Sequence, residues 1–152
     1  IFDGRVAENF KLSSGTWVSV GNIRTDILAK IDRVAQDIVI AGQDREEIGI
    51  LIFPNINSCK KLCRPISEET SNEEILRHKN VINELLVGLN DYNLKNKSTS
   101  RKVARALFLV DPPDIDSNEI TDKGYINQRA VLEGRSNYVS KLFGSGVDII
   151  IL

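Results

Sequence analysis

The fold is decided by residues 34–54, which read VAQDIVIAGQDREEIGILIFP. Two mainly apolar runs, 34–42 and 47–54, are separated by the polar turn 43–46, and Pro54 closes the second run. Continuous apolar runs of this length are typical of strands that are buried on both faces of a sheet. We therefore expect an antiparallel hairpin in the centre of a small sheet.

The residues before this hairpin predict a separate, smaller hairpin and one helix. Residues 10–12 and 17–20 have the pattern of short half-buried strands, and Gly15 is suited to a positive φ in the turn between them. Asn22 is a plausible N-cap, and the apolar spacing after it predicts a helix that ends at about Asp32.

Helices are expected after the central hairpin. Asn57 or Ser58 could cap a short helix that ends before Pro65. Ser71 opens an S-x-x-E capping box, and the apolar spacing that follows predicts one continuous helix to Leu89.

The last third of the chain supplies a third strand and a final helix. Residues 91–101 are polar and are expected to be a loop, whereas residues 103–110 predict a core strand. Residues 126–143 predict a helix that Gly134 weakens in the middle. The apolar tail 147–152 could add an edge strand or dock on a partner domain. The fold class is therefore α+β: a sheet of about three strands flanked by helices and preceded by a β-hairpin.

Composition limits the classes of function. The 152 residues suit one domain, and 20 basic against 21 acidic residues give no reason to expect nucleic acid or an acidic membrane as a partner. Two cysteines and one histidine cannot form a zinc quartet, so we expect Cys59 and Cys63 to be reduced thiols of a cytoplasmic protein, with no metal site. The chain begins at Ile1, which reads like the middle of a longer protein.

Lys123 lies at the tip of the polar loop 116–124, between the third strand and the last helix. Two prolines, Pro112 and Pro113, hold the entry to this loop extended, and Gly124 allows the backbone to turn. Taken alone, Lys123 is best explained as a solvated surface charge. The sequence has no glycine-rich phosphate-binding loop. Nothing in the sequence indicates that its single histidine forms a catalytic triad with Ser13 or Ser14.

Three blocks of sequence together resemble a known superfamily. Residues 2–18 read FDGRVAENFKLSSGTWV, residues 36–45 read QDIVIAGQDR, and residues 119–132 read EITDKGYINQRAVL. In this order and spacing they resemble the C-terminal domain of adenylate-forming enzymes, and most of all that of feruloyl-CoA synthetases. The loop reads TDKG in place of the commoner P-x-x-x-x-G-K pattern, which favours the feruloyl-type branch.

The resemblance implies a ligase reaction in two steps. Such enzymes use ATP to convert a carboxylic acid, here an aromatic one, into an acyl-adenylate, and then pass the acyl group to CoA. Residues 1–152 would be the mobile C-terminal domain, which closes over the N-terminal domain in two orientations. That partner domain would bind ATP with Mg²⁺ and the acid, so we expect this chain to be inactive alone.

The resemblance also assigns residues. Lys123 matches the catalytic lysine that bridges the attacking carboxylate and the AMP moiety, and Arg5 matches an arginine near the ribose and phosphate. The hairpin that would face the pantetheine arm of CoA comprises Lys11, Ser13, Ser14 and Gly15. The hinge would be Val6 and Ala7, where the family often has Asp or Lys at the position of Ala7.

Two alternatives remain open on the sequence. One is a non-catalytic α+β interaction module whose loop binds an anion or a partner protein. The other is the C-terminal domain of an adenylating enzyme that loads a carrier protein instead of CoA. If Lys123 completes a site on another domain, it should be exposed and unpaired in this chain, with no pocket of its own.

Overall fold

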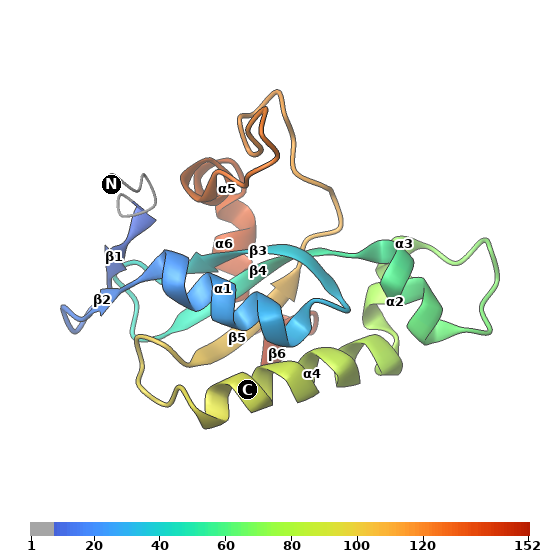
Figure 1. The fold of residues 1–152 in the computed structure, drawn as a ribbon, viewed down its shortest axis with the longest axis horizontal. Coiled ribbons are helices and arrows are strands. Elements are labelled where there is room, and N and C mark those ends of the chain that lie inside the picture. Colours follow the sequence, from blue (N-terminus) through green and yellow to red (C-terminus); the bar gives the residue numbers. More distant parts are fainter. Residues whose placement is uncertain (1–7) are drawn as a thin grey trace.

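The structure is a computed structural model that describes residues 8–152. Its centre is a four-stranded mixed sheet in the order β3-β4-β5-β6 (Figure 1). β3 (Ala35–Ala41) pairs antiparallel with β4 (Ile48–Pro54), β4 pairs parallel with β5 (Val103–Phe108), and β6 (Ile150–Ile151) pairs antiparallel with β5. The α+β prediction is confirmed, and the C-terminal tail adds the edge strand. β4 is central as expected, but β3 lies at the other edge of the sheet.

Helices cover both faces of this sheet (Figure 1). On one face, Ile38 and Ile50 belong to a core cluster that includes residues of the first four helices. On the other face, Val39 and Leu51 belong to a second cluster with residues of the last two helices. This double burial explains why β3 and β4 read as continuous apolar runs and do not alternate with polar residues.

The small N-terminal hairpin is formed as predicted. β1 (Phe10–Lys11) pairs antiparallel with β2 (Trp17–Val18), and Gly15 has a φ of +86° in the turn. α1 (Val20–Ile31) follows, but its N-cap is Ser19 and not Asn22. The helix begins earlier than predicted because Asn9 Oδ1 accepts a hydrogen bond from the Val20 N–H at 3.0 Å.

Of the two predicted helix caps after the hairpin of β3 and β4, one was wrong and one is confirmed. α2 (Ile56–Cys63) is capped by Asn55, whose Oδ1 accepts from the Ser58 N–H at 3.2 Å, so neither Asn57 nor Ser58 is the cap. α3 (Asn72–Arg77) is capped by Ser71, as the capping box predicted.

The long helix predicted from Ser71 to Leu89 is two helices. His78 has extended backbone angles, φ −63° and ψ 138°, and its Nδ1 accepts from the Asn80 N–H at 3.0 Å. His78 therefore ends α3 and caps α4 (Lys79–Leu94).

α4 also runs further than predicted, into the segment expected to be a loop. Its last turn is fixed to the neighbouring strand, because Asn93 donates to the Val103 carbonyl and accepts from the Val103 N–H, each at 2.9 Å. The Tyr92 hydroxyl donates to the Arg101 carbonyl at 2.7 Å. These tertiary contacts keep a polar segment helical.

The final helix is also divided. α5 (Gln128–Gly134) and α6 (Ser136–Leu142) meet at Arg135, whose φ of −116° and ψ of 36° are not helical. The break falls next to Gly134, where the sequence predicted a weak point. Within the described residues, no helix has the length and hydropathy required to cross a membrane.

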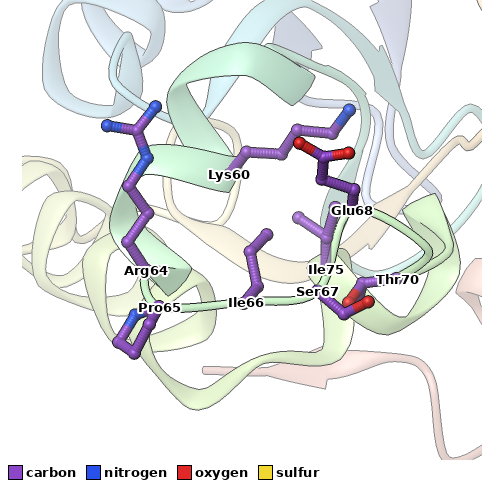
Figure 2. Close-up of a pocket in the computed structure, with 8 residues that line it drawn as sticks. All are labelled: Lys60, Arg64, Pro65, Ile66, Ser67, Glu68, Thr70 and Ile75. Carbon is purple, nitrogen blue, oxygen red and sulfur yellow. The ribbon is translucent and has the colours of Figure 1, made fainter.

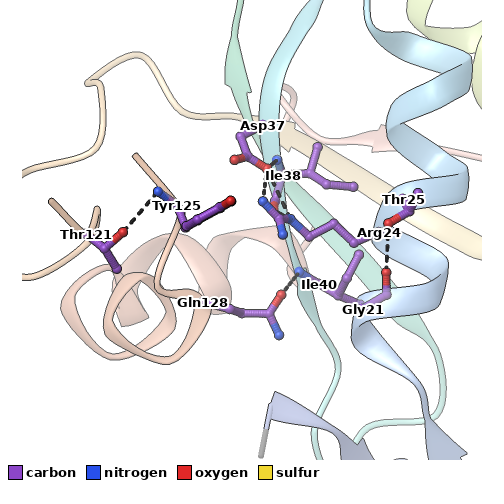
Figure 3. Close-up of polar contacts among 9 residues, drawn as sticks. All are labelled: Gly21, Arg24, Thr25, Asp37, Ile38, Ile40, Thr121, Tyr125 and Gln128. Carbon is purple, nitrogen blue, oxygen red and sulfur yellow. Dashed lines mark hydrogen bonds and ion pairs between the residues drawn. The ribbon is translucent and has the colours of Figure 1, made fainter. Parts of the chain in front are cut away.

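The outer edge of β3 is closed by side chains from two helices (Figure 3). Gln128, at the start of α5, accepts a hydrogen bond from the Ile40 N–H at 2.9 Å. From α1, Arg24 donates to the Ile38 carbonyl at 3.2 Å and pairs with Asp37 at 2.6 Å. Because these groups use the free backbone positions of β3, another strand cannot pair there without displacing them.

Candidate functional site

Lys123 lies on a tight turn whose shape is fixed by hydrogen bonds. The Thr121 N–H donates to the Tyr125 carbonyl at 2.8 Å, and the Gly124 N–H donates to the Thr121 carbonyl at 2.9 Å. The Thr121 hydroxyl also accepts from the Tyr125 N–H at 3.1 Å (Figure 3). Gly124 has a φ of +84°, which is accessible to glycine at little cost, so the residue after Lys123 is suited to close the turn.

This turn is continuous with the start of α5. Ile120 and Ile126 form an antiparallel bridge across its base, and the Asn127 N–H donates to the Glu119 carbonyl at 2.9 Å. Asn127 is also the N-cap of α5, because its Oδ1 accepts from the Ala130 N–H at 3.3 Å. Lys123 is thus carried on a short ordered projection and not on a free loop.

The Lys123 side chain itself is exposed. Among residues 8–152 it takes part in no hydrogen bond or ion pair, and it does not line the hollows at the hairpin, at the end of α2 or beside Asn118 and Asn127. Within the described part of the chain, the expectation of an exposed, unpaired lysine is met, while its chemical role stays a prediction. An ammonium in this setting is free to approach an anion presented by another surface.

The hairpin residues lie together at one end of the sheet. Ser13, Ser14 and Gly15 are exposed, and a Cβ placed on Gly15 would have no atom within 4 Å. The Lys11 ammonium lies 5.0 Å from the centre of the Trp17 ring, which is itself 61% exposed. A cation over an exposed aromatic ring is a contact of modest strength, about 0.5–1 kcal/mol.

Backbone hydrogen bonds attach this hairpin to the turn between β3 and β4. The Ser13 N–H donates to the Arg45 carbonyl at 2.9 Å, and the Asp44 N–H donates to the Lys11 carbonyl at 3.0 Å. Asp44 has a φ of +62°, one of two positive values among the described residues other than glycine. The hairpin is therefore held by the sheet and its tip remains open.

Two hollows of comparable size lie at opposite ends of the molecule (Figure 1). One, of about 660 Å³, lies among the hairpin, the β3–β4 turn and the last two helices, and its lining includes Lys11, Trp17 and Arg45. The other, also about 660 Å³, lies at the end of α2, with Lys60 and Arg64 among its lining residues (Figure 2). It contains no residue that the sequence assigned to a site.

The predicted site residues do not form one cluster. The hairpin is next to the β3–β4 turn, whereas the turn bearing Lys123 follows the long loop after β5 (Figure 1). No hydrogen bond or ion pair in the described part of the chain joins these two groups. The other three assigned residues, Arg5, Val6 and Ala7, lie outside the described residues. Among residues 8–152, the structure therefore does not bring the assigned residues together in one place.

The structure also identifies polar residues that the sequence analysis did not single out. Among the described residues, Glu119 and Gln128 are the only buried polar or charged ones, with 3% and 2% exposure. Both flank the turn that carries Lys123. Glu119 lies in a polar loop, and the sequence around it does not predict its burial. Its burial depends on Arg135, which is 16 residues further along the chain.

Comparison with known proteins adds one sequence relative. The chain matches no family model. It is 27% identical over 146 residues to a chloroplastic long-chain-fatty-acid–[acyl-carrier-protein] ligase of Arabidopsis thaliana. The match covers 94% of this chain but 18% of that protein.

The fold is shared with parts of solved adenylation domains. The adenylation domain of a carboxylic acid reductase from Segniliparus rugosus, in complex with AMP and a co-purified carboxylic acid, has a TM-score of 0.68 at 14% identity, over 94% of this chain and 21% of that one. The corresponding domain from Mycobacterium chelonae gives 0.66 at 14%, over 93% and 20%. The didomain of adenylation and carrier protein from Segniliparus rugosus, in complex with AMP, gives 0.64 at 17%, over 89% and 17%.

These findings agree with the resemblance at the level of the adenylate-forming enzymes. They do not single out the feruloyl-CoA synthetases, because the relatives are a carrier-protein ligase and the adenylation domains of carboxylic acid reductases. The chain spans about a fifth of the length of these proteins.

Proposed function

We propose that this chain is the mobile C-terminal domain of an ATP-dependent enzyme that converts a carboxylic acid into an acyl-adenylate. The observation that carries the proposal is Lys123, an exposed cation on an ordered turn that pairs with no other residue among 8–152. Its support comes from the three resembling sequence blocks and from a fold shared with adenylation domains, two of them solved with AMP. The N-terminal domain of the same enzyme would be the partner of this surface.

In the proposed reaction, a carboxylate oxygen of the acid attacks the α-phosphorus of ATP. The new O–P bond forms while the bond to the β-phosphate breaks, and pyrophosphate leaves. Lys123 would place its ammonium between the carboxylate and the α-phosphate, where it stabilises the negative charge that accumulates in the transition state. The lysine stem is long enough to reach a site on another domain.

The other assigned residues have supporting roles in this proposal. Arg5 would contact the ribose and phosphate of AMP, and Val6 and Ala7 would be the hinge for domain rotation. As the resemblance implies, Mg²⁺ would arrive with ATP on the N-terminal domain. No step on this chain is therefore assigned to the metal.

The acceptor of the acyl group defines two candidates. In the first, a feruloyl-CoA synthetase-like enzyme acts on an aromatic acid, and residues Lys11, Ser13, Ser14 and Gly15 face the pantetheine arm of CoA. In the second, the acceptor is the thiol of a carrier protein. The second candidate is favoured by the sequence relative from Arabidopsis thaliana, which is named as an acyl-carrier-protein ligase.

The role of Lys123 is tested in the full-length enzyme by separating the two half-reactions. We expect Lys123→Ala to lower acid-dependent ATP–pyrophosphate exchange by about 10²-fold or more, as for the loss of other transition-state donors. Thioester formation from supplied acyl-adenylate should change far less. Lys97→Ala, which removes another exposed lysine, is the control. Equal loss in both half-reactions would contradict the assigned role.

The acceptor and the non-catalytic alternative need separate measurements. Supplying the acyl-adenylate with either CoA or a carrier protein that bears a free pantetheine thiol distinguishes the two acceptors by which thioester forms as AMP leaves. If the wild-type full-length protein shows no pyrophosphate exchange with any aromatic or fatty acid, the interaction module becomes the better explanation of this fold.

A further inference from the structure

A buried ion pair joins Glu119, at the base of the turn that carries Lys123, to Arg135 at the end of α5. Arg135 donates from Nε to Glu119 Oε2 at 2.9 Å and from its terminal nitrogen to Glu119 Oε1 at 2.8 Å. The Glu119 side chain is 3% exposed and that of Arg135 is 11% exposed. Two parallel bonds between a guanidinium and a carboxylate fix direction as well as distance.

The same pair holds several points of the loop before the turn. Arg135 donates to the carbonyls of Asp111 and Pro112, each at 2.8 Å. Glu119 Oε1 accepts a further bond from the Asp114 N–H at 2.9 Å. This loop contains no helix or strand between β5 and α5, so these side-chain contacts replace the secondary structure that would otherwise hold it.

Arg135 also connects the loop to the sheet. Its guanidinium carbon lies 4.9 Å from the centre of the Phe53 ring on β4, and its backbone forms the junction of α5 and α6. Arg135 is therefore fixed by a helix junction and by a buried strand. Glu119 and the backbone of the loop, which Arg135 binds, are therefore fixed relative to the core of the domain.

The position of Lys123 follows from that of Glu119. The Glu119 carbonyl accepts from the Asn127 N–H at the start of α5, and the turn between these residues is closed by its own hydrogen bonds. Moving Glu119 would therefore move one side of the base of the turn. A cation that stabilises a transition state must be held within about 0.5 Å of its working position, which a loosely attached loop does not provide.

We propose that Arg135 and Glu119 are positioning residues that fix the turn of Lys123 for adenylate formation. This inference rests on the proposed function of Lys123. A purely structural pair would affect stability and both half-reactions alike, whereas a positioning pair affects mainly the step that uses Lys123. Neither side chain touches the reacting atoms in this proposal.

The test uses conservative variants in the full-length enzyme. Arg135→Lys keeps the positive charge but removes the bidentate contact with Glu119 and at least one hydrogen bond to a backbone carbonyl. Glu119→Gln keeps the shape but removes the charge. We expect each to lower the kcat of pyrophosphate exchange by about tenfold or more, since small misplacements near a reacting group can cost up to about 10²-fold. KM values and thioester formation from supplied acyl-adenylate should change less than about twofold.

The matched control is Arg24→Lys. Arg24 is also a partly buried arginine paired with a carboxylate, Asp37, but it lies on α1 at the edge of β3 and makes no hydrogen bond to the loop. Its substitution should lower the melting temperature comparably and leave the ratio of the two half-reactions unchanged. If Arg135→Lys fails to fold, Glu119→Gln and Glu119→Asp carry the test.

Amide hydrogen exchange of residues 114–125 provides a readout independent of activity. We expect it to rise in the Arg135 and Glu119 variants and not in Arg24→Lys. If exchange rises but Lys123→Ala itself has no effect on adenylation, the proposed function fails while the pair still orders the turn. Unchanged amide exchange, or equal loss in both half-reactions, would overturn the positioning role.

Discussion

Glu119 is a buried carboxylate whose ionised form is stabilised by the native fold. The hydrogen bonds from Arg135 lower its pKa below the usual value of 4.5, against the opposing effects of burial and of the nearby charge of Asp114. A carboxyl group with a lowered pKa contributes stability above its unfolded pKa. That contribution is lost as the pH falls through the lowered value.

We therefore predict that acid destabilises the wild-type domain more steeply than Glu119→Gln. Below about pH 5, the free energy of unfolding of the wild type should fall with a larger slope, and the two slopes should converge near neutral pH. Urea titrations at a series of pH values measure this. Part of the slope persists in the variant, because Asp91 and Asp148 also have lowered pKa values. If the exposed Glu69→Gln flattens the slope as much as Glu119→Gln does, the explanation is wrong.

The two cysteines give a second prediction at this scale. Both thiols are free and buried, and burial together with the nearby Cys63 raises the pKa of Cys59 to about 11. Since the thiolate is the reactive form, we expect neither Cys59 nor Cys63 to react with Ellman's reagent at pH 8 in the native domain. Both should react in denaturant. Rapid stoichiometric reaction of the native protein would show that the thiols are accessible.

Single residues were predictable from the sequence where the physics is local. The positive φ of Gly15 and the cap at Ser71 each depend on neighbours within a few positions. Asn22 was a wrong cap because the first helical N–H is satisfied by Asn9, 11 residues before Val20. The burial of Glu119 likewise depends on a partner that is distant in the sequence. The sequence therefore identified Lys123 as a candidate residue but not the ion pair of Glu119 and Arg135 beside its turn.

At the scale of elements, the strands were predicted well and the helix ends were not. β3, β4 and β5 have a strong signal because both of their faces are buried. The breaks at His78 and Arg135 have a weak signal, since helical spacing continues across each of them. His78 caps α4 through a local bond to the Asn80 N–H, but histidine is not among the preferred N-cap residues. Arg135 leaves the helix to bind Glu119, 16 residues earlier in the chain, and such a tertiary contact gives no local signal.

The packing of α1 against α4 depends on Gly88. A Cβ at this position would overlap the carbonyl oxygen of Lys30 and lie 2.7 Å from Ile31 Cγ2. Helix propensity alone would make Gly88→Ala stabilising by about 1 kcal/mol. The overlap involves backbone, which cannot move without shifting a helix, and such overpacking costs about 1–3 kcal/mol.

We therefore predict that Gly88→Ala lowers the free energy of unfolding, because the steric cost exceeds the gain in propensity. Chemical denaturation of the variant and of Val87→Ala measures it. Val87 is 69% exposed on the same helix, so its substitution should change stability by less than about 0.5 kcal/mol. A more stable Gly88→Ala would mean that the two helices are not in close contact.

At the scale of the whole molecule, the two groups of assigned residues occupy different parts of the surface. The hairpin tip is next to the β3–β4 turn, while Lys123 is carried beyond the loop after β5 (Figure 1). The sequence identified both groups through the resemblance, but their separation depends on how the sheet and α5 are arranged. Under the proposed function, these two separate groups would act in different half-reactions.

Together with the proposed function, this arrangement leads to a prediction of opposite selectivity for Gly15 and Lys123. In the full-length enzyme, Gly15→Phe should lower thioester formation more than pyrophosphate exchange, whereas Lys123→Ala should do the reverse. Gly15→Ala is the control for backbone strain, because any side chain at a φ of +86° costs about 1–2 kcal/mol. Since a Cβ at this site meets no atom within 4 Å, the additional loss in Gly15→Phe reports an obstruction that comes from the acceptor or from the other domain. If Gly15→Phe impairs pyrophosphate exchange more than thioester formation, the hairpin does not face the acceptor, and one orientation of the domain would have to serve both steps.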